Sequence, residues 1–324
     1  MASDSKKKTG VVALAKELVT LLVVVFIIRT FGFGLYQVPT GSMETTVLVG
    51  ERFFADKFTI LFSPPQRGEI IAFNQPETMY EYSSNPIQYF IQRYIWGPLN
   101  LTKRVIGVPG DKIQGVIEDG KPVIYINGKK FDEPYLNKYP IIAVYKESPE
   151  EVEQMTDGKL AELLLTHRID PSHINELKGQ LKEHFATYKS YDPSKPWDDQ
   201  PFYRINPARL ALGADGKPLM RYPNTLSAPD YKPETHGKNV WGHNSDEFYL
   251  ELGPDQYWCM GDNRLGSGDS RSFGPVSASH IHGKILFRIW SIDSDESWWI
   301  VDLLKHPLDF WKRVRWSRFF QMVK

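Results

Sequence analysis

The first clear pattern along the chain is an apolar segment near its start. Residues 18–28 read LVTLLVVVFII without a charge, and apolar flanks extend the run to residues 11–33. A helix of about 23 residues is roughly 35 Å long, enough to cross the hydrocarbon core of a bilayer. Lys16, Glu17 and Arg29 lie near its ends, where long side chains can reach the headgroups. The pattern predicts a transmembrane helix at residues 11–33.

The charges before this segment predict its orientation. Residues 1–10 contain Lys6, Lys7 and Lys8, so the positive-inside rule makes them a cytoplasmic tail. The rest of the chain is then expected on the opposite side of the membrane. Two other interpretations stay open: a cleaved secretory signal, and a buried helix of a soluble domain.

Short segments of β type follow the apolar run. They are rich in aromatic and β-branched residues or alternate in polarity, and glycine- or proline-containing turns separate them. Asp119-Gly120 is typical of a tight hairpin turn. The pattern predicts a mainly β fold of antiparallel strands. The predicted strands are residues 51–62, 69–74, 112–118, 122–127, 257–260 and 283–290.

Helical spacing interrupts this β pattern beyond residue 146. Ser148-Pro149-Glu150-Glu151 is a capping box with proline at the first helical position, and Asp170-Pro171 repeats the start signal. Residues 146–245 are therefore predicted to be a partly helical insertion between two parts of one β domain, residues 34–145 and 246–295. A surface elaboration and a docking surface both stay open as its role.

Residues 296–324 form a C-terminal tail in which tryptophans alternate with basic residues. Aromatic rings beside basic groups are typical of a membrane interface. A plain surface helix or an extended tail explains the composition equally well, so both interpretations stay open.

Charge and composition exclude several function classes. The chain has 39 basic and 39 acidic residues, a balance that does not favour nucleic-acid binding. Cys259 is the sole cysteine, and histidines form no ligand motif, so neither a disulfide nor a metal site is expected. No cofactor is expected either.

Candidate chemistry begins with Ser42, in the turn Val38-Pro39-Thr40-Gly41-Ser42-Met43 directly after the apolar run. A serine hydroxyl needs a base, and no histidine stands in a suitable motif. Lys103 lies among leucine, valine and isoleucine residues, and desolvation by such neighbours lowers a lysine pKa. Taken alone, Ser42 could be an ordinary turn serine and Lys103 an exposed charge.

A polar segment further along the chain bears on the choice between these interpretations of Ser42 and Lys103. Residues 261–274 contain Gly261-Asp262-Asn263-Arg264, Ser267, Asp269 and Arg271. Such a density of acids, bases and hydroxyls is typical of an ordered polar loop, because each buried polar group needs a partner.

The three segments in this order resemble the type I signal peptidase family. The family pattern is a Pro-Ser/Thr-Gly-Ser-Met turn after a membrane helix, a Lys-Arg-x-x-Gly-x-Pro-Gly-Asp segment, and Gly-Asp-Asn-Arg-x-x-Ser-x-Asp-Ser-Arg. The chain matches all three, and Arg67-Gly68-Glu69 begins a weaker fourth match. The resemblance covers roughly residues 10–130 and 250–295 and leaves out the insertion. It implies an antiparallel β-sheet catalytic domain after an N-terminal transmembrane helix.

The resemblance implies a role for each of the following residues. Ser42 would be the nucleophile and Lys103 the general base and acid. The Ser42 backbone N–H and the Thr40 hydroxyl would form the oxyanion hole. Ser267 would orient Lys103, Asp269 and Arg271 would brace the site, and Met43 would pack near the cleavage pocket. Gln37, Val38, Pro39 and Leu101 would bind substrate as strand edges.

By the same resemblance, the substrates are preproteins whose signal peptides end in small residues. The enzyme would lie in the bacterial inner (cytoplasmic) membrane as a single-pass protein, with lipid bilayer and signal peptides as partners. Its N-terminus would be cytoplasmic and its catalytic domain extracytoplasmic.

Three other interpretations compete with this one. A self-cleaving repressor with a serine–lysine pair would need a DNA-binding module, and none precedes Ser42. A penicillin-binding acyltransferase would need Ser-x-x-Lys, and the only clear match, at Ser5, is trivial. A catalytically inactive, membrane-anchored precursor-binding protein of the same fold stays as the alternative.

Overall fold

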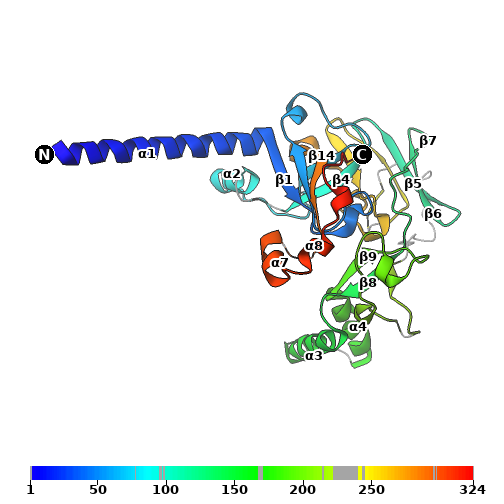
Figure 1. Ribbon diagram of the computed structural model, residues 1–324. Helices are drawn as coiled ribbons and strands as arrows, with labels where there is room; N and C mark the ends of the chain where they lie inside the picture. Colours follow the sequence, from blue (N-terminus) through cyan, green and yellow to red (C-terminus); the bar gives the residue numbers. More distant parts are fainter. Residues whose placement is uncertain are drawn as a thin grey trace.

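The computed structural model describes residues 2–76, 78–94, 97, 99–166, 171–213, 215–221, 240–242, 245–294, 296 and 298–323. Figure 1 shows a long N-terminal helix that projects from a body of β-sheets, with a pair of helices on another side of that body. All the named strands pair antiparallel. The predicted antiparallel β fold with additional helices is therefore confirmed.

A seven-stranded sheet forms the centre of this body, in the order β1-β2-β14-β3-β4-β12-β13. Strand β14 pairs with both β2 and β3, and register shifts interrupt each pairing. Such bulges increase the local twist and bend of a strand. The strands are β1 Phe33–Gln37, β2 Glu51–Asp56, β3 Ile70–Asn74, β4 Asn100–Gly107, β12 Gln256–Met260, β13 Val276–Ser277 and β14 Ile281–Ser291.

A four-stranded sheet, β11-β5-β6-β7, contains the predicted hairpin. Its turn has positive φ angles at Asp119 (50°) and Gly120 (73°), which a two-residue hairpin turn of this hand requires. Asp–Gly tolerates these angles better than most residue pairs. The strands are β5 Lys112–Glu118, β6 Lys121–Ile126, β7 Lys129–Lys130 and β11 Phe248–Glu251.

One apolar cluster joins these two sheets, and a second lies on the large sheet. Trp258 from the large sheet and Phe248 from the smaller one are both fully buried, with ring centroids 5.0 Å apart. A second cluster packs Met43 against Phe53 and Ile70. Because Met43 directly follows Ser42, burial of Met43 fixes the chain next to the candidate nucleophile.

The predicted insertion contains a helical pair and two strands of a small sheet, whose central strand β8 directly precedes the insertion. Helices α3 Pro149–Thr166 and α4 Ile174–His184 pack on each other. The capping box forms as predicted: Ser148 N donates to Glu151 Oε2 (2.9 Å) and Glu151 N to Ser148 Oγ (3.3 Å). The predicted start signal at Asp170 lies outside the described residues. The sheet has the order β10-β8-β9, with β8 Ile141–Tyr145, β9 Ala186–Ser190 and β10 Met220–Arg221.

The N-terminal helix α1 runs from Ala2 to Ile27 and continues as a short π-helix to Gly32. It therefore includes most of the predicted cytoplasmic tail, residues 1–10. Within the described part of the chain, none of the helices has both the length and the apolar character needed to cross a membrane. The transmembrane helix predicted at residues 11–33 is thus unconfirmed.

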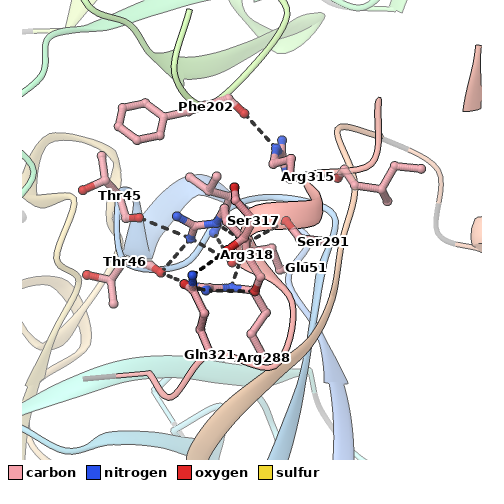
Figure 2. A network of polar contacts seen from close by, with 12 residues as sticks. Thr45, Thr46, Glu51, Phe202, Arg288, Ser291, Arg315, Ser317, Arg318 and Gln321 are labelled. Atoms are coloured by element: carbon pink, nitrogen blue, oxygen red, sulfur yellow. Dashed lines mark hydrogen bonds and ion pairs between the residues drawn. The ribbon is translucent and has the colours of Figure 1, made fainter. Parts of the chain in front are cut away.

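The C-terminal segment is attached to the large sheet by buried ion pairs. The Glu51 carboxylate lies 2.6 Å from Arg318 Nε and 2.8 Å from Arg288 Nε, and it accepts a hydrogen bond from Ser291 Oγ (2.8 Å). Figure 2 shows both guanidinium groups also reaching the Thr46 carbonyl, four residues after Ser42.

The short helices are α2 Pro86–Tyr94, α6 Ser270–Phe273, α7 Trp299–Lys305 and α8 Phe310–Arg313.

The ionisation of Glu51 follows from these contacts. Burial alone would raise the pKa of Glu51, but the hydrogen bond and charge of Arg318 and the charge of Arg288 outweigh it and hold that pKa below its ordinary value. The carboxylate is therefore charged at neutral pH and ties the C-terminal segment to the chain that follows the candidate nucleophile.

We expect Glu51→Ala to lower the free energy of unfolding at pH 7 by about 3–5 kcal/mol, because it leaves buried guanidinium groups without their carboxylate. Urea denaturation of the full chain in detergent, followed by circular dichroism, measures this change. Glu251→Ala is the matched control: it removes a carboxylate from an exposed pair with Lys112, and its unfolding midpoint should match that of wild type. An unchanged midpoint for Glu51→Ala would contradict the proposed attachment.

Candidate active site

The candidate nucleophile lies in a tight turn that follows β1. The Val38 N–H donates to the Glu51 carbonyl (3.0 Å), and a single 3₁₀ turn then covers Gly41–Met43. Ser42 is 7% exposed. A Cβ on Gly41 would lie 2.4 Å from Glu44 Oε1, so a larger residue here would displace the buried Glu44 carboxylate.

Asn263 holds the Ser42 turn in place from the polar loop. Its backbone N–H donates to the Ser42 carbonyl (3.1 Å), and its side-chain Nδ2 donates to the Gly41 carbonyl (2.9 Å). Asn137 Nδ2 in turn donates to Asn263 Oδ1 (3.2 Å). The sequence placed Asn263 in a motif but gave it no role, and the structure shows that it positions the turn.

Ser42 and Lys103 are in direct contact. Lys103 Nζ lies 2.8 Å from Ser42 Oγ and 3.1 Å from the Thr102 carbonyl. Lys103 is 3% exposed and lies on β4, opposite Ile71 of β3. Buried Ile71 and Val105 belong to one apolar cluster, against which Leu101 also packs. The strand therefore presents an amine to a hydroxyl in an environment with little water.

Burial lowers the pKa of Lys103 from 10.5 to about 8, although the negative charge of Asp269 partly opposes this change. With that pKa, about a tenth of the amines are neutral at pH 7, against roughly one in a few thousand for an ordinary lysine. A neutral amine next to a hydroxyl can accept its proton, so the arrangement is suited to activating a serine.

Asp269 and Arg271, to which the resemblance gives a bracing role, form a buried ion pair. Arg271 Nε and Nη2 each donate to the Asp269 carboxylate (2.9 Å), and Arg271 Nη1 donates to Asp246 (2.6 Å). Asp269 also accepts a hydrogen bond from the Gly261 N–H (3.0 Å). Burial alone would raise the pKa of Asp269, but the charge and hydrogen bonds of Arg271 lower it below its ordinary value.

Ser267 is near the nucleophile but is not hydrogen-bonded to Lys103. A Cβ on Gly261 would lie 2.3 Å from both the Ser267 hydroxyl and the Ser42 carbonyl. Both serines therefore pack against Gly261, in space that a side chain would occupy. The buried Ser267 hydroxyl makes no hydrogen bond of ordinary geometry to any described residue. The role expected for Ser267, orienting the Lys103 amine, stays a prediction.

A second buried ion pair fixes the strand that carries Lys103. The neighbouring Arg104 donates from Nε and Nη2 to the two oxygens of Asp262 (2.8 and 2.6 Å), and its guanidinium lies 3.9 Å from the centre of the Tyr135 ring. Thr46 Oγ1 also donates to Asp262 Oδ2 (2.5 Å). Asp262 therefore links the Ser42 side of the site to the Lys103 side.

Glu44, two residues after Ser42, connects the site to the insertion. It is fully buried and accepts hydrogen bonds from Ser190 N (3.0 Å), the Ser190 hydroxyl and the Tyr203 hydroxyl. Burial is the main reason that the pKa of Glu44 is raised above its ordinary value. No pattern in the sequence indicates this role of Glu44, because its partners lie about 150 residues away in a segment without a motif.

Two hydrogen-bond donors near Ser42 are not used by the described residues. The Ser42 backbone N–H has no partner among them, as is usual for the first turn of a helix. The Thr40 side chain makes no capping hydrogen bond, and Thr40 is exposed. The oxyanion-hole role that the resemblance implies for these two groups stays a prediction.

A groove of about 930 Å³ opens onto Ser42 and Lys103. The four residues expected to bind substrate all line it, and Met43 lines it as well. β1 is an edge strand, and β12 pairs with β4 only from Arg104 onward, so one edge of residues 101–103 is unpaired. The expected substrate residues in the groove are Gln37, Val38, Pro39 and Leu101.

The site shows no sign of a metal centre. Among the described residues, no group of three or more histidine, cysteine, aspartate or glutamate side chains could hold a metal ion. The residues around Ser42 are instead paired with each other, as the ion pairs of Asp262 and Asp269 show.

Comparison with known proteins identifies the family. The model of the family described as "Signal peptidase, peptidase S26" matches residues 11–174 and 204–290, which is most of the chain. The chain is 26% identical over 327 residues to "Signal peptidase I" of Rickettsia prowazekii (strain Madrid E), covering 93% of this chain and 89% of that protein. It is 30% identical over 135 residues to "Signal peptidase I P" of Bacillus subtilis subsp. natto.

The shorter matches are partial. The Bacillus match covers 42% of this chain and 60% of the relative, and a match to "Probable signal peptidase I-2" of Synechocystis covers 50% of that relative. A solved structure of a signal peptidase I from Enterococcus faecalis V583 is 18% identical, with 69% of this chain and 97% of that chain covered. Its TM-score is 0.26, too low to support a structural argument.

We expect Lys103→Met to change the pH dependence of stability. The pKa of Lys103 is lower in the folded chain (about 8) than in the unfolded chain (10.5), so the unfolded state binds more protons between these values. Wild-type stability relative to Lys103→Met should therefore rise by up to about 3 kcal/mol from pH 7 to pH 10.5. Urea denaturation at several pH values measures the difference.

The exposed Lys121 on β6 provides the matched control for this comparison. Lys121→Met shows how much the pH dependence of stability changes when an exposed lysine is replaced by methionine. A difference between wild type and Lys103→Met that stays constant from pH 7 to pH 10.5 would show that Lys103 has an ordinary pKa.

Proposed function

Because the chain belongs to the signal peptidase family of hydrolases, we propose that it is a serine endopeptidase that removes N-terminal signal peptides from exported preproteins. The observation that carries this proposal is the 2.8 Å contact between Lys103 Nζ and Ser42 Oγ, away from solvent. A serine–lysine pair of this geometry supports an acyl-enzyme mechanism.

In this mechanism, neutral Lys103 accepts the Ser42 proton while Ser42 Oγ attacks the scissile carbonyl carbon. The oxygen of that carbonyl becomes negative and accepts hydrogen bonds from the Ser42 N–H and the Thr40 hydroxyl, each typically worth about 3–4 kcal/mol in the transition state. The Lys103 ammonium then gives its proton to the leaving amine, which departs with the mature protein.

The second half of the reaction releases the signal peptide. Neutral Lys103 accepts a proton from a water molecule, and the resulting hydroxide attacks the ester carbonyl carbon formed with Ser42. The ester bond breaks, Ser42 Oγ recovers a proton from Lys103, and the signal peptide leaves with a new carboxyl group, which loses its proton to water. Ser267 and the Asp269–Arg271 pair keep the amine in register during both halves.

The groove supports an extended substrate. Its unpaired backbone at residues 101–103 and the chain at residues 37–39 offer hydrogen bonds to a peptide in the manner of an added strand. Its lining contains Val38, Met43 and Leu101, which suit the small apolar residues before the cut.

We also propose that α1 anchors the enzyme in the inner membrane, with its N-terminus in the cytoplasm and the β domain outside. The apolar side chains from Leu18 to Ile28 support this, because they are 41–59% exposed on a helix that projects from the body (Figure 1). Exposed apolar area of this extent is costly in water and favourable in lipid. An inactive precursor-binding protein is less well supported, because it would not need the buried amine.

We expect Ser42→Ala and Lys103→Arg each to reduce preprotein cleavage by about 10³-fold or more in detergent. Alanine removes the attacking oxygen, and a guanidinium stays protonated at every accessible pH. Gel analysis of cleavage over time gives the rates. Lys112→Arg, at an exposed position of β5, is the control and should cleave at the wild-type rate. Substantial turnover by Lys103→Arg would rule out a lysine base.

A further inference from the structure

A second hollow, of about 400 Å³, adjoins the groove at residues 37–40. One wall consists of Asn263 and Gly266 of the polar loop. The other comes from the insertion and includes Lys146, residues 187–189 and Arg221. We call this space the insertion hollow. Thr40 lines both spaces, whereas Ser42 and Lys103 line the groove but not the hollow.

The insertion wall is fixed relative to the nucleophile turn. Ser190, the last residue of β9, donates to the Glu44 carboxylate, which lies two residues after Ser42. Tyr203 donates its hydroxyl hydrogen to the same carboxylate and accepts a hydrogen bond from the Val49 N–H (3.1 Å). Strand β9 therefore holds Tyr188 and Lys189 at a set position beside the site.

The charge of the insertion hollow is positive. Lys146, Lys189 and Arg221 form no ion pair with any other described residue. Arg221 stacks over the Tyr188 ring (3.9 Å to its centre), and Lys189 Nζ lies 5.0 Å from the centre of the Tyr203 ring. Ring contacts of this kind position a cation but leave its charge in place. The carboxylate in the lining, Glu296, is already paired with Lys305 (2.5 Å).

Resting on the proposed function, we infer that the insertion hollow receives the first residues of the mature protein, after the scissile bond, and favours acidic side chains there. The apolar groove with its unpaired strand edges suits the end of the signal peptide. An extended chain with its scissile carbonyl at Ser42 then continues past Thr40 into the hollow. Cations without carboxylate partners attract a carboxylate at that point. The insertion thereby acquires a role in substrate selection.

The experiment uses the full chain in detergent and peptides that share one signal-peptide end. The peptides differ only at the first three positions after the cut, where they carry Asp, Asn or Lys. The ratio of kcat/KM for the Asp peptide to that for the Asn peptide measures the preference. We expect a ratio of about 5–10 at low ionic strength that falls toward 1 as salt is added. The Lys peptide should be cut more slowly than the Asn peptide.

Variants test whether the insertion hollow causes this preference. In Lys189→Glu/Arg221→Glu the ratio should drop below 1 and the Lys peptide should become the better substrate. Lys195→Gln, an exposed lysine elsewhere in the insertion, is the matched control and should keep the wild-type ratio. Both kcat/KM values of a ratio are measured on one enzyme preparation. A lower fraction of folded protein therefore reduces both values equally and leaves the ratio unchanged.

The outcomes separate this inference from the proposed function. Equal cleavage of the Asp, Asn and Lys peptides would overturn the inference and leave the proposed function standing. An unchanged preference in Lys189→Glu/Arg221→Glu would also overturn it, because the preference would then arise elsewhere. Failure to cut any of the peptides or a preprotein would overturn the proposed function, and the inference with it.

Discussion

A lysine amine held against a serine hydroxyl, with almost no access to bulk water, is the constraint on which the rest of the structure depends. Lys103 is 3% exposed and lies 2.8 Å from Ser42 Oγ. Burial penalises the charged amine, which lowers its pKa to about 8 and makes it able to serve as the neutral base of the proposed mechanism. The same burial lowers the stability of the folded chain, so other interactions must keep the amine in its buried position.

Buried ion pairs around the site supply that rigidity. Arg104 and Asp262 tie the strand of Lys103 to the polar loop, and Arg271 with Asp269 closes the loop behind the amine. Pairs like these contribute little net stability compared with apolar packing, but each is costly to break, which favours a single arrangement. Glu44 and Glu51 extend the arrangement to the insertion and to the C-terminal segment. Segments distant in sequence therefore meet at one turn.

Much of this could be predicted from the sequence where the cause is local. Aromatic and β-branched segments predicted several strands, Asp119-Gly120 predicted the hairpin, and Ser148 with Glu151 predicted the first helix of the insertion, because each depends on near neighbours. The strand predicted at residues 51–62 was too long, since β2 ends at Asp56 and a 3₁₀ turn covers Thr59–Leu61. Strand β4, which carries Lys103, was not among the predicted strands. The three motifs placed Ser42, Lys103 and Asp269 near one another. Partners joined only by the fold were not predictable: Glu44 with Ser190, and Glu51 with Arg318, are contacts over more than a hundred residues that no spacing encodes.

The central claim is tested most directly by the pH dependence of kcat/KM for preprotein cleavage, which reports the ionisation of essential groups in the free enzyme. If Lys103 is the base, kcat/KM should rise tenfold per pH unit at acidic pH and level off with an apparent pKa near 8, the value that burial gives Lys103. A rate that is flat from pH 6 to pH 10, or one that levels off near the ordinary pKa of histidine, would show that the Lys103 amine is not the base.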